Sequence, residues 1–117
     1  MEIWHNPRCS KSRTAVAFLD EAGVEYTVRR YLEDSPSADE IRDLLGLLGM
    51  EPWEITRTGD QPAKDLGMAA WGKTADDRER WITALAENPA LIQRPIVTTD
   101  QGHAVVARTE DALQSLL

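Results

Sequence analysis

The fold is decided between residues 2 and 31, which read EIWHNPRCSKSRTAVAFLDEAGVEYTVRRY. Residues 2–4 predict a short strand, and residues 11–22 predict a helix that ends at Gly23. The helix is indicated by apolar side chains that recur at helical spacing, at Ala15, Phe18, Leu19 and Ala22. Past the glycine, apolar and polar residues alternate from residue 24 to Tyr31, as in a half-buried strand. This β-α-β unit predicts two parallel strands joined by a right-handed crossover.

The middle of the chain, from about residue 37 to 90, predicts a run of helices. Ser37-Ala38-Asp39-Glu40 has the pattern of a capping box, which predicts a helix that ends at Gly49. Two short helices with proline at their starts are expected at residues 52–55 and 62–65. A longer helix is expected from about residue 75 to 87, with Thr74 as its cap and Asn88-Pro89 at its end.

The C-terminal part predicts a hairpin and one more helix. Residues 96–99 and 104–106 are β-prone and flank a turn that contains Gly102. Thr109 is the expected cap of a last helix over residues 110–116. The order β-α-β, helices, β-β-α fits a thioredoxin-like α/β fold, with a mixed four-stranded sheet and an inserted helical subdomain at about residues 37–90. A different α/β sandwich fits the same order.

Length and composition indicate a single domain, residues 1–117, with a core of its own. The 117 residues match the usual size of one domain. A hydrophobic fraction of 42% and a charged fraction of 28% are ordinary for a globular chain. The first residues lack the pattern of a secretory signal, and no stretch approaches the ~20 apolar residues of a membrane span. A single cysteine cannot form an internal disulfide, which is typical of proteins in a reducing compartment. We therefore expect a cytoplasmic protein that does not interact with membranes.

The net charge of −7 argues against direct nucleic-acid binding, which needs a basic face. An anionic substrate would be repelled by the mean field of the chain, so it could bind only where cations cluster. Ten of the 13 basic residues are arginine, whose planar guanidinium binds oxyanions in a bidentate manner. A plain compositional bias toward arginine explains the same count. We expect neither a metal site nor a bound cofactor.

Cys9 is the only cysteine, and it stands in the loop between the first expected strand and the first expected helix. A helix N-terminus and nearby cations lower the pKa of a thiol and so favour the nucleophilic thiolate. A lone cysteine is often a small buried hydrophobe instead. Its neighbours Arg8, Lys11 and Arg13 favour the nucleophile.

Ser12 occupies the position of the second cysteine in Cys-x-x-Cys motifs. An oxidised Cys9 therefore needs a second thiol from a small molecule or from a partner protein. A phosphatase loop is not indicated, because Arg13 gives Cys-x3-Arg instead of Cys-x5-Arg. His5 either supports this loop or is simply solvated.

Arg94-Pro95 precedes the third expected strand, at a place where a strand tolerates proline. In a thioredoxin-like fold a cis-proline faces the cysteine loop at this point, which would carry Arg94 close to Cys9. Arg57 and Arg108 come from distant segments. The three arginines either converge on the cysteine or lie scattered on the surface.

These residues resemble the glutaredoxin-coupled arsenate reductases of the thioredoxin-like superfamily, over essentially the whole chain. The matching motifs are His5-Asn6-Pro7-Arg8-Cys9, Ser12-Arg13, Tyr31-Leu32-Glu33, Arg57, Arg94-Pro95-Ile96-Val97 and Arg108. Ser10 and Lys11 follow the cysteine as in a second subgroup, where better-known members have glycine and threonine.

The resemblance implies a role for each matching residue. Cys9 would attack arsenate, and the oxyanion would be bound by Arg57, Arg94 and Arg108. The residues implied to support the cysteine loop are His5, Ser12, Arg13 and Pro95. The resemblance also implies a cytoplasmic role in arsenical resistance, with glutathione or another low-molecular-weight thiol as co-substrate and a glutaredoxin-type protein as partner.

Two other functions fit the same sequence. A redox-sensing regulator that binds RNA polymerase resembles the same fold, although such regulators commonly carry Cys-x-x-Cys, and Ser12 removes that option. The second alternative is a thioredoxin-like module whose Cys9 is glutathionylated without turnover.

Overall fold

The computed structural model describes residues 1–117 and divides them into two compact units. The first unit comprises Met1–Asp34 and Arg94–Leu117, and the second comprises Ser35–Gln93. The second unit thus interrupts the first along the sequence, and it contains the residues where the helical insert was expected.

The first unit contains a four-stranded mixed sheet with the order β2-β1-β3-β4. Its elements are β1 (Glu2–Trp4), α1 (Ser10–Ala22), β2 (Thr27–Arg29), β3 (Ile96–Thr98), β4 (Ala104–Val106) and α5 (Glu110–Gln114). β1 pairs in parallel with β2, while the β1–β3 and β3–β4 pairs are antiparallel. The predicted fold class is confirmed, including the parallel pair and the C-terminal hairpin.

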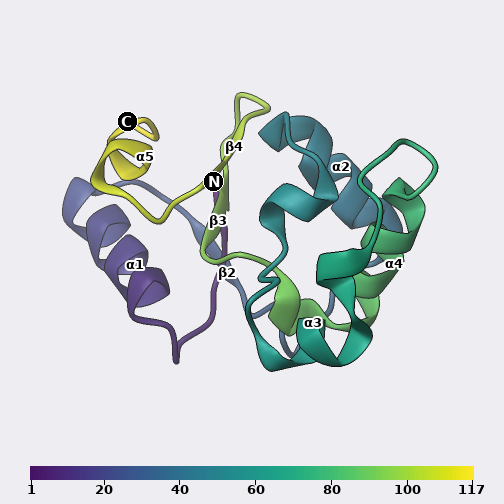
Figure 1. Ribbon diagram of the computed structural model, residues 1–117. Coiled ribbons are helices and arrows are strands. Elements are labelled where there is room, and N and C mark those ends of the chain that lie inside the picture. Colours follow the sequence, from purple (N-terminus) through teal and green to yellow (C-terminus); the bar gives the residue numbers. More distant parts are fainter. The chain divides into compact units, whose positions relative to one another are not determined.

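The core of the first unit lies between the sheet and two helices. α1 and α5 cover the same face of the sheet (Figure 1). Ala15 and Leu19 of α1 pack with Ile3 of β1 and Val97 of β3, and all four side chains are fully buried. Burying a leucine, isoleucine or valine side chain stabilises the fold by about 1.5–3 kcal/mol, and burying an alanine less. This packing holds the start of α1 in place relative to the two central strands.

The second strand is shorter than predicted, and Val28 is 47% exposed. β2 lies at the edge of the sheet and has only the three residues of β1 to pair with. The alternating pattern before it is nevertheless used, since Val24 and Tyr26 pack against the core. The prediction of a strand from residue 24 to Tyr31 was therefore wrong in its length.

The last helix is also shorter than the predicted span of residues 110–116. Thr109 caps it as predicted, because its hydroxyl oxygen accepts the N–H of Ala112 at 3.1 Å. At the other end, the N–H of Leu116 donates to the carbonyl of Leu113. Such an i→i−3 bond tightens the last turn beyond the α-helical geometry.

The second unit contains helices only, apart from a single bridge between Thr56 and Ile92. Its elements are α2 (Ala38–Leu48), η1 (Pro52–Ile55), α3 (Gln61–Leu66), η2 (Met68–Ala70), α4 (Arg78–Glu87) and η3 (Pro89–Leu91), where η marks 3-10 helices. Trp81 of α4 is fully buried, and its indole N–H donates to the carbonyl of Gly72 at 2.8 Å. In neither unit is a helix both long and apolar enough to cross a membrane.

α4 begins at Arg78, later than predicted, and Thr74 is not its cap. The carboxylate of Asp77 instead accepts from both the hydroxyl and the backbone N–H of Thr74, at 2.8 and 3.4 Å. Because Asp77 turns back toward Thr74, residues 75–77 form a turn in place of the first helical turn. The end of the helix before Pro89 is as predicted.

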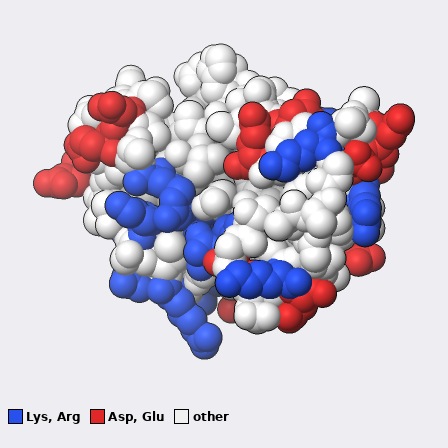
Figure 2. Space-filling model, in the orientation of Figure 1, with Lys and Arg blue, Asp and Glu red and all other residues white.

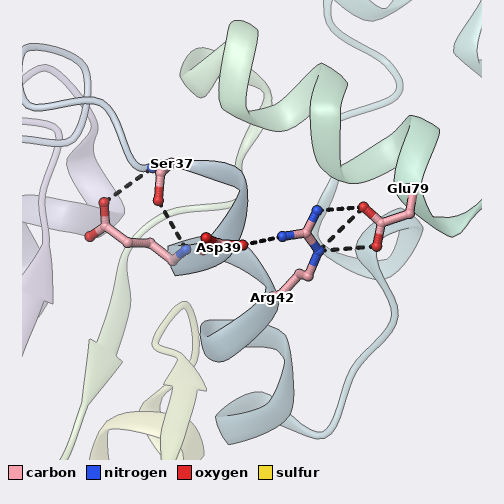
Figure 3. A network of polar contacts seen from close by, with 5 residues as sticks. Ser37, Asp39, Arg42 and Glu79 are labelled. Carbon is pink, nitrogen blue, oxygen red and sulfur yellow. Dashed lines mark hydrogen bonds and ion pairs between the residues drawn. The ribbon is translucent and has the colours of Figure 1, made fainter.

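The predicted capping box of α2 is confirmed (Figure 3). The hydroxyl oxygen of Ser37 accepts the N–H of Glu40, and the carboxylate of Glu40 accepts the N–H of Ser37, both at 3.1 Å. Further along the helix, Arg42 forms ion pairs with Asp39 and, at 2.6 Å, with Glu79 of α4. The capping box thus sets the start of a helix that is tied to its neighbour by charge.

We predict that Ser37→Ala lowers the free energy of unfolding by about 1 kcal/mol, because the N–H of Glu40 loses its acceptor. Urea denaturation followed by circular dichroism measures the change. Ser35→Ala, in the exposed loop before the helix, is the matched control and should stay within about 0.5 kcal/mol of the unchanged protein. Equal effects of the two substitutions would contradict a capping role.

Candidate active site

Cys9 is the N-cap residue of α1 and directly follows the loop after β1. Its backbone is extended (φ −94°, ψ 124°), and the residue is partly exposed. Its N–H donates to the carbonyl of Asn6, and its carbonyl accepts the N–H of Arg13, both at 3.0 Å. The thiol is therefore held at the positive end of the helix dipole, where reagents can reach it.

Ser12 is the buried centre of the cysteine loop. Its hydroxyl oxygen accepts the N–H of Asn6 at 3.0 Å and lies 2.7 Å from Nδ1 of His5. Arg13 adds a bond from Nη1 to the carbonyl of Pro7 at 3.0 Å. The structure thus brings His5, Ser12 and Arg13 together around the loop that they were predicted to support.

His5 is neutral at neutral pH. Burial lowers the pKa of His5, and the positive charges of Arg30 and Arg13 lower it further. A neutral imidazole supplies no positive charge to a nearby thiolate, so its contribution to the loop is the contact with Ser12.

Arg30 was missed by the sequence analysis. Parallel pairing sets Trp4 opposite Arg29, so the next position along each strand sets His5 opposite Arg30. The backbone N–H of His5 donates to the carbonyl of Arg29 at 2.8 Å, which continues this pairing. The register of the two parallel strands was the signal that could have revealed Arg30.

The pairing of β1 with β3 carries Arg94 toward the cysteine loop. Trp4 pairs with Ile96 in antiparallel register, so the residues just before β3 lie near the end of β1, where the cysteine loop begins. The Arg94-Pro95 peptide bond is cis, as predicted. The guanidinium of Arg94 interacts with the Cys9 thiol through a hydrogen bond and through its charge. Arg94 is thus found where the sequence analysis expected it.

The pKa of the Cys9 thiol lies below its ordinary value. Burial acts in the opposite direction and raises the pKa, but the N–H groups of Ser12 and Lys11 and the guanidinium of Arg94 together outweigh it. The two N–H groups belong to the first turn of α1 and act on the sulfur although Cys9 makes no capping hydrogen bond of ordinary geometry. The site therefore favours the nucleophilic thiolate.

The two other arginines predicted to bind the oxyanion, Arg108 and Arg57, belong to different units of the chain. Arg108 follows β4, and its Nη1 donates to the carbonyl of Arg94 at 2.6 Å. Arg57 belongs to the second unit, where its Nε donates to Asp60 at 2.7 Å. Arg108 thus contacts Arg94, while the roles of Arg57 and Arg108 in binding an oxyanion stay predictions.

Basic side chains gather on the first unit over the end where α1 begins (Figure 2). The loop and the first helical turn contribute Arg8, Lys11 and Arg13. Against a net charge of −7, this is a local positive area of the kind that an anionic substrate requires. No group of three or more His, Cys, Asp or Glu side chains is placed to hold a metal ion.

The fold and the site define a thioredoxin-like protein with one partly exposed cysteine of lowered pKa at the start of its first helix. The sequence pattern of the ArsC family matches residues 4–116, and the chain belongs to this family. The resemblance seen in the sequence is thereby confirmed.

Three similar proteins illustrate the relationship. A Streptomyces viridochromogenes protein described as an uncharacterized protein in the glnII region is 60% identical over 117 residues, which cover 100% of this chain and 98% of that protein. An arsenate reductase of Neisseria meningitidis serogroup A is 36% identical over 118 residues, covering 100% of this chain and 97% of the relative. The solved structure of an arsenate reductase from Vibrio cholerae is 37% identical, covers 100% of this chain and 98% of its own, and has a TM-score of 0.88.

We predict that Cys9 reacts with iodoacetamide at lower pH in the folded protein than in the unfolded chain. The lowered pKa leaves more thiolate below the ordinary pKa of a thiol. The measurement is the alkylation rate against pH, in buffer and in concentrated urea. Because Cys9 is the only cysteine, the unfolded chain is its own control. A folded midpoint at or above the unfolded one would contradict the prediction.

We also predict that Ser12→Ala lowers the free energy of unfolding by about 1–3 kcal/mol, because it leaves the buried N–H of Asn6 without its acceptor. Urea denaturation measures the loss. Ser10→Ala, on the exposed side of the same helical turn, is the matched control with little expected change. A Ser12→Ala protein as stable as the control would mean that the loop does not depend on the Ser12 hydroxyl.

Proposed function

We propose that this protein reduces arsenate to arsenite with Cys9 as the nucleophile. The observation that carries the proposal is the guanidinium of Arg94 at a partly exposed thiol whose pKa is lowered. An anion that approaches this thiol meets the positive charge of Arg94 at the same point. The proposal is supported by the names of the N. meningitidis and V. cholerae relatives, both called arsenate reductases.

In the first step, the Cys9 thiolate attacks the arsenic atom of arsenate. A sulfur–arsenic bond forms, and one As–OH group takes up a proton and leaves as water. Arg94 stabilises the negative charge on the arsenate oxygens during the attack, which is a preorganised electrostatic role. The product is a covalent adduct between Cys9 and As(V).

In the second step, a small thiol such as glutathione attacks the Cys9 sulfur. A sulfur–sulfur bond forms while the sulfur–arsenic bond breaks, and its electron pair stays on arsenic. Arsenic is reduced from As(V) to As(III), and the two sulfur atoms are oxidised to a mixed disulfide. The small thiol has to come from outside, because the chain has no second cysteine.

In the third step, a thiolate of a glutaredoxin-type protein attacks the mixed disulfide and releases the Cys9 thiolate. A cytoplasmic location is part of the proposal, because the cycle consumes reduced thiols that the cytoplasm supplies. Arg57 and Arg108 are proposed to contribute further positive charge to the bound oxyanion.

We predict that purified protein forms arsenite from arsenate in the presence of glutathione and a glutaredoxin system, and that Cys9→Ser abolishes this activity. Arg94→Met should lower kcat/KM by about 10²-fold or more, a loss expected when a preorganised charge partner is removed. Arsenite is quantified directly, and mass spectrometry of quenched reactions detects the mixed disulfide on Cys9.

Lys73→Met removes an exposed cation outside the proposed site and should leave kcat/KM unchanged. The assay is repeated with other low-molecular-weight thiols in place of glutathione, since the reductant is part of the proposal. No Cys9-dependent arsenite with any of these thiols would refute the proposed function.

A further inference from the structure

Arg94 precedes β3 and Arg108 follows β4, so both residues lie at the same end of the C-terminal hairpin. The register of β3 and β4 pairs Ile96 with Val106, and the N–H of Ala107 donates to the carbonyl of Pro95 at 2.9 Å. Beyond this bond the ladder ends, because the N–H of Arg108 donates to the carbonyl of Val106 at 3.0 Å.

The Arg108 side chain is directed to the backbone of Arg94. Its Nη1 donates to the Arg94 carbonyl at 2.6 Å. This hydrogen bond is charge-assisted, and it is therefore stronger than a hydrogen bond between two neutral backbone groups. Both residues are partly buried, which limits the competition from water. The bond anchors the point of the backbone from which the Arg94 side chain extends.

The Arg94 side chain, in turn, acts on the Cys9 thiol, because its guanidinium lowers the pKa of the sulfur by hydrogen bonding and by its charge. Arg94 thus connects the two residues: its carbonyl accepts from the Arg108 guanidinium, and its own guanidinium acts on the sulfur.

We propose that Arg108 is a positioning residue, which holds the guanidinium of Arg94 at the Cys9 sulfur by binding the Arg94 carbonyl. Its importance for catalysis rests on the proposed function, but its effect on the resting thiol does not. Without Arg108, the Arg94 backbone loses its anchor, and its guanidinium spends less time at the sulfur. This role is separate from any contact of Arg108 with an oxyanion.

A double-mutant cycle on the arsenate-free protein tests the proposal. The variants are Arg94→Met, Arg108→Met and the double variant, because methionine keeps an unbranched apolar stem and removes the donors. The readout is the iodoacetamide alkylation rate of Cys9 against pH, which follows its thiolate fraction. Thermal unfolding of each variant verifies that it is folded.

We expect Arg108→Met to slow alkylation at neutral pH by about twofold or more and to move the midpoint to higher pH. In the Arg94→Met background the same substitution should have no further effect, because the two residues act in series. An equal effect in both backgrounds would overturn the proposal, since Arg108 would then act on the sulfur directly. No effect of Arg108→Met alone would overturn it as well.

Should Arg108→Met fail to fold, Arg108→Leu takes its place in the same cycle, because leucine also removes the donors, and the same two outcomes are decisive. Because no arsenate is present, the result does not depend on whether the protein reduces arsenate. A coupled cycle in a protein without reductase activity would support the positioning role and refute only the proposed function.

Discussion

The antiparallel pairing of β1 with β3 is the constraint on which the site depends. Three residue pairs, from Glu2 with Thr98 to Trp4 with Ile96, join the first strand to a strand that follows the whole second unit. Ile3 and Val97 are directly paired and fully buried, so a slip of β3 by one residue against β1 would turn Val97 out of the core. Because α1 packs against Ile3 and Val97, it stabilises this register of β3 against β1. The same register places Arg94, just before β3, close to the cysteine loop.

The lowered pKa of Cys9 depends on a small number of groups that lie close to its sulfur. Two N–H groups of the first turn of α1 and the guanidinium of Arg94, from the segment just before β3, act on the Cys9 thiol. His5 adds no charge, since burial and two arginines keep it neutral. In a chain with a net charge of −7, the positive potential at Cys9 is therefore local, and depends on backbone geometry as much as on composition.

The sequence predicted those features that follow from periodicity and from single strong signals. Helical spacing located α1, and the proline after Arg94 indicated a cis bond and the approach of Arg94 to Cys9. It did not predict choices between competing local hydrogen bonds. Thr74 and Asp77 are both competent N-caps, and nothing in their order shows that Asp77 would turn back to bind Thr74.

The hydrogen-bond partners of long side chains could not be predicted from the sequence either. Arginine has several rotatable bonds and five N–H donors, so its position in the chain says little about its partner. Arg108 binds the backbone of Arg94, and Arg57 binds Asp60 within the second unit. The resemblance to the family singled out both residues in the sequence, but it does not show these contacts.

Ser12 links the architecture of the loop to the need for an outside thiol. Its buried oxygen accepts the N–H of Asn6 and contacts His5, so the position carries a structural hydrogen-bonding role. A thiol is a weak donor and a weak acceptor, and a cysteine at this position would satisfy the same partners poorly. The serine at this position supports the loop that contains Cys9. Because it is not a cysteine, Cys9 has no second sulfur in the chain with which to form an internal disulfide. In the proposed cycle, the residue that supports the loop around Cys9 is therefore also the residue that leaves the second thiol to come from another molecule.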